Sequence, residues 1–185
     1  AREARRGVFC KCSMWSIKVI QTNSNHDAIF KLASLWRSKT NSKIIAITGS
    51  NGKTTVKELL FHILNNKYKC SKSIGNYNSS IGLPLSFLNS MLNDKYTILE
   101  LGANKNGEIA LLCKFVKPHY SLITNISNNH IQNFRSFNEI VETKGAIFKS
   151  LDKNGIAFVN LDDNEISKMN FSNKKITFSI NNSNS

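Results

Sequence analysis

The sequence contains no long hydrophobic run and no cysteine pattern of a metal site. No apolar stretch approaches the ~18 residues that a membrane-spanning helix needs, and no secretory signal pattern opens the chain. Among the four cysteines, Cys10 and Cys12 form a C-x-C rather than the C-x-x-C pairs of a zinc site. These absences exclude a membrane-spanning protein and a zinc module, and they favour free thiols in a reducing, cytoplasmic location.

Acidic residues are scarce, since 12 Asp and Glu stand against 25 Lys and Arg and give a net charge of +13. Such an excess is typical of proteins that bind nucleic acid. Here, however, the lysines are scattered singly among Asn and Ser, with no dense basic stripe and no interleaved aromatic residues. The distribution therefore favours an anionic small molecule over a nucleic acid as the partner.

The length of 185 residues suits one ordinary domain with a single core. We expect an irregular, Arg-rich N-terminal extension over residues 1–25, a folded domain over residues 26–180 and a polar tail over residues 181–185. The chain opens with Ala1 rather than Met and closes on a stretch rich in Ser and Asn, so a fragment or a trimmed product is expected.

Apolar strand-like runs alternate with helix-like stretches along the folded region. The strands are expected at 43–48, 96–101, 120–125, 155–160 and 174–179, and the helices at 26–38, 54–66, 83–92, 107–116 and 136–150. On the first helix the predicted apolar face includes Leu32 and Leu35. The alternation predicts βαβ units, and hence an α/β fold with a mostly parallel sheet flanked by helices. Ligands of such sheets bind beyond the carboxyl ends of the strands.

The segment TGSNGKTT, residues 48–55, connects the first strand to the following helix. Its two glycines allow a tight turn whose N–H groups approach phosphate oxygens, and the helix directs its positive end at the same place. Lys53 can reach the outer phosphates, and the Thr54 hydroxyl can bind Mg²⁺. The general phosphate-loop pattern requires a glycine where this chain has Ile47, so the match to that pattern is incomplete.

Three further side chains follow the strands or lie on a helix beyond them. Glu100 ends an apolar strand, where it either meets solvent or is paired with a metal ion held by Thr54 and a nucleotide. His130 follows the next strand and is either an ordinary histidine or a ligand of a second Mg²⁺. Lys144 is a solvated lysine on bare physics, and only carbamylation by CO₂ would convert it into a metal ligand.

Taken in order, these segments resemble the central ATP-binding domain of the Mur ligases. The resemblance rests on TGSNGKTT, the Glu of ELGANKNGEI, the His of TNISNNH and the Lys of ETKGAIF, and it covers about residues 26–179. The family's loop also lacks the first glycine, so Ile47 agrees with it. The segments GNYNSSIGLPLSFL and ELGANKNGEI are most similar to the branch of the family that joins D-Ala-D-Ala to UDP-MurNAc-tripeptide.

The resemblance implies an ATP- and Mg²⁺-dependent amide ligase of peptidoglycan precursor synthesis in the cytoplasm, acting through an acyl phosphate. The sequence does not define the oligomeric state, and a monomer is our guess. The resemblance gives catalytic roles to Lys53, His130 and Lys144, one Mg²⁺ to Thr54 and Glu100, and a second to His130 and a carbamylated Lys144. The implied nucleotide-binding residues are Gly49, Ser50, Asn51, Gly52, Lys53, Thr54, Thr55 and Asn160. The residues implied to face the UDP-sugar are Asn76 and Asn78.

The family also has an N-terminal domain that binds the uridine and a C-terminal domain that brings the amine substrate. We expect both to be absent from this chain. An alternative interpretation is therefore a truncated, non-catalytic ATP-binding remnant or module of such a ligase.

Overall fold

A computed structural model describes residues 22–128 and 131–181 of the chain. Most of the predicted extension over residues 1–25, together with His130, lies outside the described residues. The described part forms a six-stranded sheet in the order β2-β3-β1-β4-β5-β6. Every strand pairing in it is parallel. The predicted α/β fold with a parallel sheet and flanking helices is therefore confirmed.

The elements alternate along the chain as the sequence pattern predicts. The strands are β1 Lys43–Thr48, β2 Cys70–Lys72, β3 Tyr96–Glu100, β4 Tyr120–Ile123, β5 Ile156–Asn160 and β6 Lys174–Phe178. The helices are α1 Asn25–Lys39, α2 Lys53–Asn65, α3 Gly82–Phe87, α4 Glu108–Val116, α5 Phe137–Lys149 and α6 Asn164–Ser167, with a short 3₁₀ turn at Ile131–Asn133.

Strand β1 lies in the middle of the sheet, paired with β3 on one side and β4 on the other. Ile44, Ala46 and Ile47 are fully buried, as expected for a parallel strand that is covered on both faces. The carboxyl ends of β1, β3 and β4 consequently meet at one edge of the sheet. That edge carries the segments singled out in the sequence.

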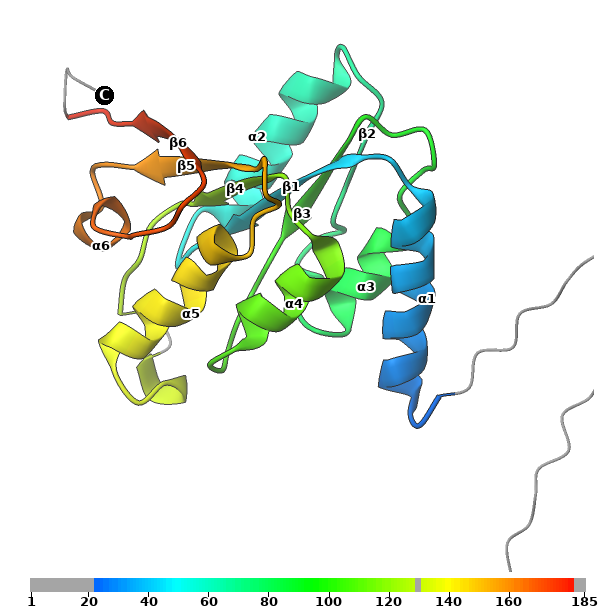
Figure 1. The fold of residues 1–185 in the computed structure, drawn as a ribbon, viewed down its shortest axis with the longest axis horizontal. Helices are drawn as coiled ribbons and strands as arrows, with labels where there is room; N and C mark the ends of the chain where they lie inside the picture. Colours follow the sequence, from blue (N-terminus) through cyan, green and yellow to red (C-terminus); the bar gives the residue numbers. More distant parts are fainter. Residues whose placement is uncertain (1–21, 129–130, 182–185) are drawn as a thin grey trace, which may run out of the picture.

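The helices cover the two faces of the sheet unequally. Figure 1 shows α2 on one side of the sheet and α1, α3, α4 and α5 on the other. The main core fills the space between the sheet and this second group of helices, and it includes Leu112 and Val116 of α4 and Ile140 and Phe148 of α5. No helix of the described residues is long and apolar enough to cross a membrane.

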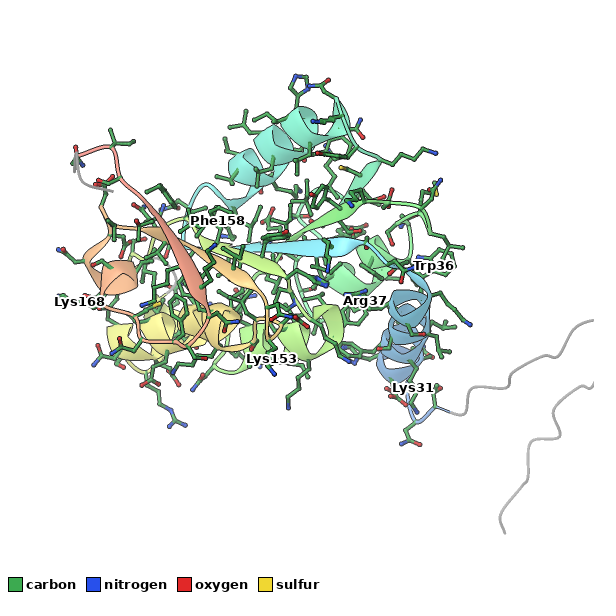
Figure 2. All side chains as sticks on the ribbon, turned by 45° about the horizontal axis from the view of Figure 1, so that its top comes forward. Lys31, Trp36, Arg37, Lys153, Phe158 and Lys168 are labelled. Carbon is green, nitrogen blue, oxygen red and sulfur yellow. The ribbon has the colours of Figure 1, made fainter. Side chains whose placement is uncertain are left out.

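The predicted apolar face of α1, which included Trp36 as well as Leu32 and Leu35, is only partly correct, because Trp36 packs on the core but the two leucines do not. Leu32 and Leu35 are 47% and 45% exposed, whereas Ala33 is fully buried and Phe30 packs on the core. Polar contacts at the end of α1 set its rotation. Trp36 Nε1 donates to the Ser90 carbonyl at 3.0 Å, and Arg37 Nε donates to the Val116 carbonyl at 3.1 Å. Figure 2 shows both side chains at that end of the helix.

Several predicted boundaries differ from the structure. The helix expected at 83–92 is only the six residues of α3, and the strands expected to end at 101, 125 and 179 end earlier. The sequence analysis missed β2 and α6, which have three and four residues. Elements this short carry too few residues for a periodic pattern.

Candidate functional site

The loop between β1 and α2 depends on two glycines. Gly49 has a φ of 148° and Gly52 a φ of 77°, conformations that residues with a side chain rarely adopt. A Cβ atom at Gly49 would lie 1.9 Å from Thr124 Oγ1, so the backbone here packs directly on the segment after β4. Helix α2 begins at Lys53, immediately after this turn. The predicted phosphate-loop geometry, a tight turn followed by a helix N-terminus, is present.

Two residues after β4 hold this loop in place. The Ser50 N–H donates to the Asn125 carbonyl at 2.9 Å, and the Asn51 N–H donates to Asn125 Oδ1 at 3.1 Å. Thr124 Oγ1 in turn donates to the Asn51 carbonyl at 2.6 Å. Neither Thr124 nor Asn125 was singled out in the sequence. Their position directly after a strand that neighbours β1 was the signal that could have identified them.

Two lysine ammonium groups converge on the same backbone oxygen of the loop. Lys53 Nζ donates to the Gly49 carbonyl at 2.9 Å and to the Ser50 carbonyl at 3.1 Å. Lys144 Nζ, from α5, donates to the Gly49 carbonyl at 3.1 Å. Neither lysine forms an ion pair with a carboxylate of the described residues. Two close cations without an anionic partner create a strong site for an anion.

The environment of both lysines disfavours their charged forms. Burial lowers the pKa of Lys53, although the Glu100 carboxylate acts against this shift. Burial, and then the charge of Lys53, lowers the pKa of Lys144 to about 8. Desolvation and a nearby like charge are the two causes that depress a lysine pKa. An appreciable fraction of Lys144 is therefore a neutral, nucleophilic amine near neutral pH.

Helix α5 brings Lys144 to the loop. Ser136 caps the start of the helix, where its Oγ accepts a hydrogen bond from the Glu139 N–H at 3.3 Å. Two turns later Lys144 is only 8% exposed, and Thr143 donates to Asn106 Oδ1 at 3.1 Å, linking α5 to the segment after β3. The interpretation of Lys144 as an ordinary solvated lysine is therefore wrong.

Glu100 is buried at the carboxyl end of β3, with 2% of its surface exposed. Thr54 Oγ1 donates to Glu100 Oε2 at 2.8 Å, and Asn78 Nδ2 donates to Glu100 Oε1 at 2.9 Å. Lys57 Nζ lies 3.6 Å from Oε2. The interpretation of Glu100 as a strand-end residue in solvent is wrong, because this carboxylate is buried and paired.

The residues around Glu100 suit Mg²⁺ bound together with a nucleotide. The described residues contain no cluster of three His, Cys, Asp or Glu side chains that could hold a metal by themselves. Mg²⁺ usually takes only one or two carboxylates and completes its shell with phosphate oxygens and water. The hydroxyl of Thr54 and the carboxylate of Glu100, joined by a hydrogen bond of 2.8 Å, match that requirement, so the residues present fit the ion.

A cavity of about 140 Å³ opens beside the loop. Its walls combine the loop, both lysines and the segments that follow β2 and β3. The lining residues are Gly49, Ser50, Lys53, Asn78, Ser79, Gly102, Ala103, Asn104, Glu108 and Lys144. The cavity is therefore polar, and its charged lining residues are two lysines and one carboxylate, that of Glu108. This lining suits phosphate groups rather than an apolar ligand.

The remaining predicted residues lie at different places. The side chain of Asn76 is exposed on the loop that precedes Asn78. Asn160 lies at the end of β5, where its Nδ2 donates to the Thr124 carbonyl at 3.0 Å, and it does not line the cavity. Thr55 is exposed in the first turn of α2. The functional roles assigned to these residues stay predictions.

The sequence analysis also missed Lys57. Its side chain is fully buried, and its Nζ donates to the Gly75 carbonyl at 2.6 Å. Lys57 lies one helical turn after Lys53, on the face of α2 that turns toward the sheet. That spacing was an available signal, but a lysine within a helix is normally solvated.

The fold and this loop define a nucleotide-binding α/β domain of the phosphate-loop type. Residues 47–185 match the sequence profile of the Mur ligase middle domain. The chain therefore belongs to the Mur ligase family, and the predicted resemblance is confirmed.

Two relatives with the same name are among the similar proteins. The chain is 50% identical over 116 residues to the UDP-N-acetylmuramoyl-tripeptide--D-alanyl-D-alanine ligase of Borreliella burgdorferi, covering 63% of this chain and 25% of that protein. It is 40% identical over 137 residues to the ligase of the same name from Rickettsia prowazekii, covering 74% of this chain and 30% of that protein. The chain thus spans less than a third of the length of either relative.

A solved structure agrees with the sequence comparison. The crystal structure of MurF ligase from Thermotoga maritima in complex with ADP superposes with a TM-score of 0.79 at 32% identity. The match covers 93% of this chain and 40% of the other.

Proposed function

We propose that this chain is the ATP-binding domain of a ligase that joins D-Ala-D-Ala to UDP-MurNAc-tripeptide in the cytoplasm. The observation that carries the proposal is the convergence of Lys53 and Lys144 on the Gly49 carbonyl, at 2.9 and 3.1 Å, without a carboxylate partner among the described residues. Two such cations beside a helix N-terminus suit the terminal phosphates of ATP. The similarity to ligases of that name supports the choice of substrates.

In the proposed reaction the terminal carboxylate of the tripeptide attacks the γ-phosphorus of ATP. The bond to the β,γ-bridging oxygen breaks, ADP leaves and an acyl phosphate forms. The ammonium of Lys53 counters the charge of two anions that must approach one another, and it stabilises the transferring phosphoryl group. A bound Mg²⁺, held by Thr54 and Glu100, would supply further neutralisation of the phosphate charge.

The second half of the reaction forms the amide. The amine of D-Ala-D-Ala attacks the acyl carbon, a tetrahedral intermediate forms, and inorganic phosphate leaves. The C–N bond forms on attack, the bond between the acyl carbon and the phosphate oxygen breaks when the intermediate collapses, and the proton lost by the amine passes to the departing phosphate or to solvent. In this domain Asn78, which lines the cavity, is assigned to the side that faces the UDP-sugar, together with Asn76.

The carbamylation of Lys144 is part of the proposal. Its neutral amine would attack CO₂ to give a carbamate, an anionic oxygen ligand, and release one proton. The cation pair of the unmodified chain would then be replaced by Lys53 and by a carbamate whose negative charge a second Mg²⁺ would offset. The lowered pKa of Lys144, about 8, supports this chemistry because only the neutral amine reacts. The proposed second Mg²⁺ would then be held by this carbamate and by His130, which lies outside the described residues.

A second candidate is a non-catalytic ATP-binding module. The glycine turn and the two lysines that share the Gly49 carbonyl would serve nucleotide binding without any ligation. The coding sequence around this segment distinguishes the candidates, since a ligase requires neighbouring regions that bind the uridine and deliver the amine.

The test of the ligase is phosphate release by the protein expressed from the complete reading frame. We expect release that requires ATP, UDP-MurNAc-tripeptide and D-Ala-D-Ala together, and that is lost in Lys53→Ala. Release that ignores D-Ala-D-Ala, or full turnover by Lys53→Ala, would refute the proposed reaction.

A further inference from the structure

Lys57 is a buried cation to which the proposed reaction gives no role. It is fully buried on α2, one turn beyond Lys53. Its Nζ donates to the Gly75 carbonyl at 2.6 Å and lies 3.6 Å from Glu100 Oε2 and 3.5 Å from Oε1 of its neighbour Glu58. A buried ammonium is costly unless it is paired, and removing one partner of such a pair leaves an uncompensated charge. Gly75 and Glu100 belong to different segments, so the lysine links them.

The segment reached by Lys57 is the loop between β2 and α3. This loop, residues 74–78, carries both asparagines assigned to the substrate. Elsewhere the Ile74 N–H donates to Ser86 Oγ at 2.6 Å, the Gly102 N–H donates to the Asn78 carbonyl at 2.8 Å, and Tyr77 packs closely on Gly82. The loop therefore depends on individual contacts rather than on regular structure.

Lys57 and Asn78 hold the Glu100 carboxylate from two sides. Asn78 Nδ2 binds Oε1 at 2.9 Å, while Lys57 faces Oε2 at 3.6 Å. Asn78 also packs closely on Gly102, since a Cβ atom at Gly102 would lie 2.7 Å from Asn78 Oδ1. Glu100, the loop and α2 thus form one connected polar cluster.

We propose that Lys57 is a positioning residue that fixes the loop of residues 74–78 against the Glu100 carboxylate. The proposal rests on the proposed function, which assigns Glu100 to the metal and the loop to the UDP-sugar. Lys57 touches no reacting atom in this scheme. Lys57 connects the start of α2, next to the phosphate loop, with the loop of residues 74–78. Its positive charge also disfavours the binding of a metal ion at the Glu100 carboxylate.

The first test is amide hydrogen exchange on the ligand-free chain with the substitution Lys57→Met. We expect the hydrogen-bonded amides of Tyr77, Asn78 and Gly102 to exchange about tenfold faster or more, because a hydrogen bond from a charged donor is lost. The amide of Ile156, which donates to the His119 carbonyl at 2.9 Å far from the loop, serves as the internal reference. Its exchange should not change.

A control is Lys31→Met, which removes an exposed lysine that pairs with Asp27 on α1. Its loop exchange should equal that of the unmodified chain, because exposed ion pairs contribute little. If Lys57→Met does not fold, Lys57→Gln keeps a donor without the charge and should show a smaller acceleration. Equal acceleration at the loop and at Ile156, or no acceleration at either, would overturn the positioning role.

The second test uses Mg²⁺ and ADP as probes and measures the Mg²⁺ concentration at which half of the chain binds ADP. Lys57→Met should lower that concentration, because a cation 3.6 Å from the Glu100 oxygen is removed. If Lys57 only supported the fold, its loss would weaken ADP binding and raise the Mg²⁺ concentration that is required. A raised or unchanged Mg²⁺ concentration would therefore count against the proposal. If the unmodified chain does not bind ADP at all, the proposed function fails, while the exchange experiment still decides the role of Lys57.

Discussion

Gly49→Ala is the substitution for which the structure gives the clearest magnitude. The added Cβ would lie 1.9 Å from Thr124 Oγ1 and 3.1 Å from the Thr124 backbone nitrogen. Thr124 cannot move away freely, because its hydroxyl donates to the Asn51 carbonyl at 2.6 Å. The φ of 148° at Gly49 adds backbone strain to this collision.

The two contributions can be added to obtain an expected loss of stability. Strained backbone costs about 1–3 kcal/mol, and a side chain forced into packed surroundings costs about 1–3 kcal/mol more. The free energy of unfolding should therefore fall by about 2–6 kcal/mol. For a domain of this size Tm falls about 2–4 °C per kcal/mol, so thermal unfolding followed by circular dichroism should show a decrease of about 4–24 °C.

Gly52→Ala is the matched control. Gly52 also has a positive φ, 77°, but a Cβ atom there would meet nothing within 4 Å. Only the strain of about 1–2 kcal/mol remains, so its Tm should fall by about 2–8 °C. Adding Thr124→Ala to Gly49→Ala should recover part of the loss, since the colliding hydroxyl is removed. Equal losses for the two glycine variants, or no recovery in the double variant, would refute the reasoning.

Three further outcomes are expected. Thr54→Ala and Glu100→Gln should each raise the Mg²⁺ concentration needed for ADP binding by about tenfold, measured by titration calorimetry, because each removes one ligand; unchanged values would exclude this metal site. Isotopically labelled CO₂ should give a carbamate signal that grows from about pH 7 to about pH 9, because the amine of Lys144 loses its proton over this range. Full activity of Lys144→Arg in the ligase would contradict the carbamate. Burial, Lys43 and Arg37 lower the pKa of His119, so its neutral form, which accepts the Ile44 N–H at 3.1 Å, dominates the folded state. Stability should thus be complete above the unfolded pKa of about 6.5 and fall as the pH drops through the lower folded value; a flat profile from about pH 7 to about pH 5 would exclude this.

The sequence predicted the elements whose patterns are local. The strand before Gly49, the glycine turn and the helix after it follow one another within a few residues, and all three are found in the structure. Glu100 and Lys144 were placed on the correct elements because apolar strands and amphipathic helices have clear periods. The burial of Glu100 was left open and Lys144 was interpreted as solvated, since burial depends on segments far away in the chain.

The residues that were missed depend on tertiary contacts. Lys57 looks like any exposed helical lysine until the loop of residues 74–78 and the Glu100 carboxylate are packed over it. The rotation of α1 was also mispredicted, because Leu32 fits an apolar stripe as well as Ala33 does. Contacts of Trp36 and Arg37 with distant backbone carbonyls decide which of the two is buried.

The scattered positive charge did not require a nucleic-acid partner. In the structure Lys31, Lys153 and Lys168 lie well apart from one another on the molecule (Figure 2). The convergent cations are instead Lys53 and Lys144, which share the Gly49 carbonyl. This distribution supports the prediction of a small anionic ligand, which remains to be tested by binding.

Equilibrium binding of ATP to the chain in the presence of Mg²⁺ tests the central claim most directly. The account predicts saturable binding at one site, weakened about tenfold or more by Lys53→Ala because a charge-assisted contact to phosphate is lost. The exposed Lys31→Ala should bind ATP as the unmodified chain does. No binding by the unmodified chain, or equal affinity in Lys53→Ala, would contradict the assignment of this loop to ATP.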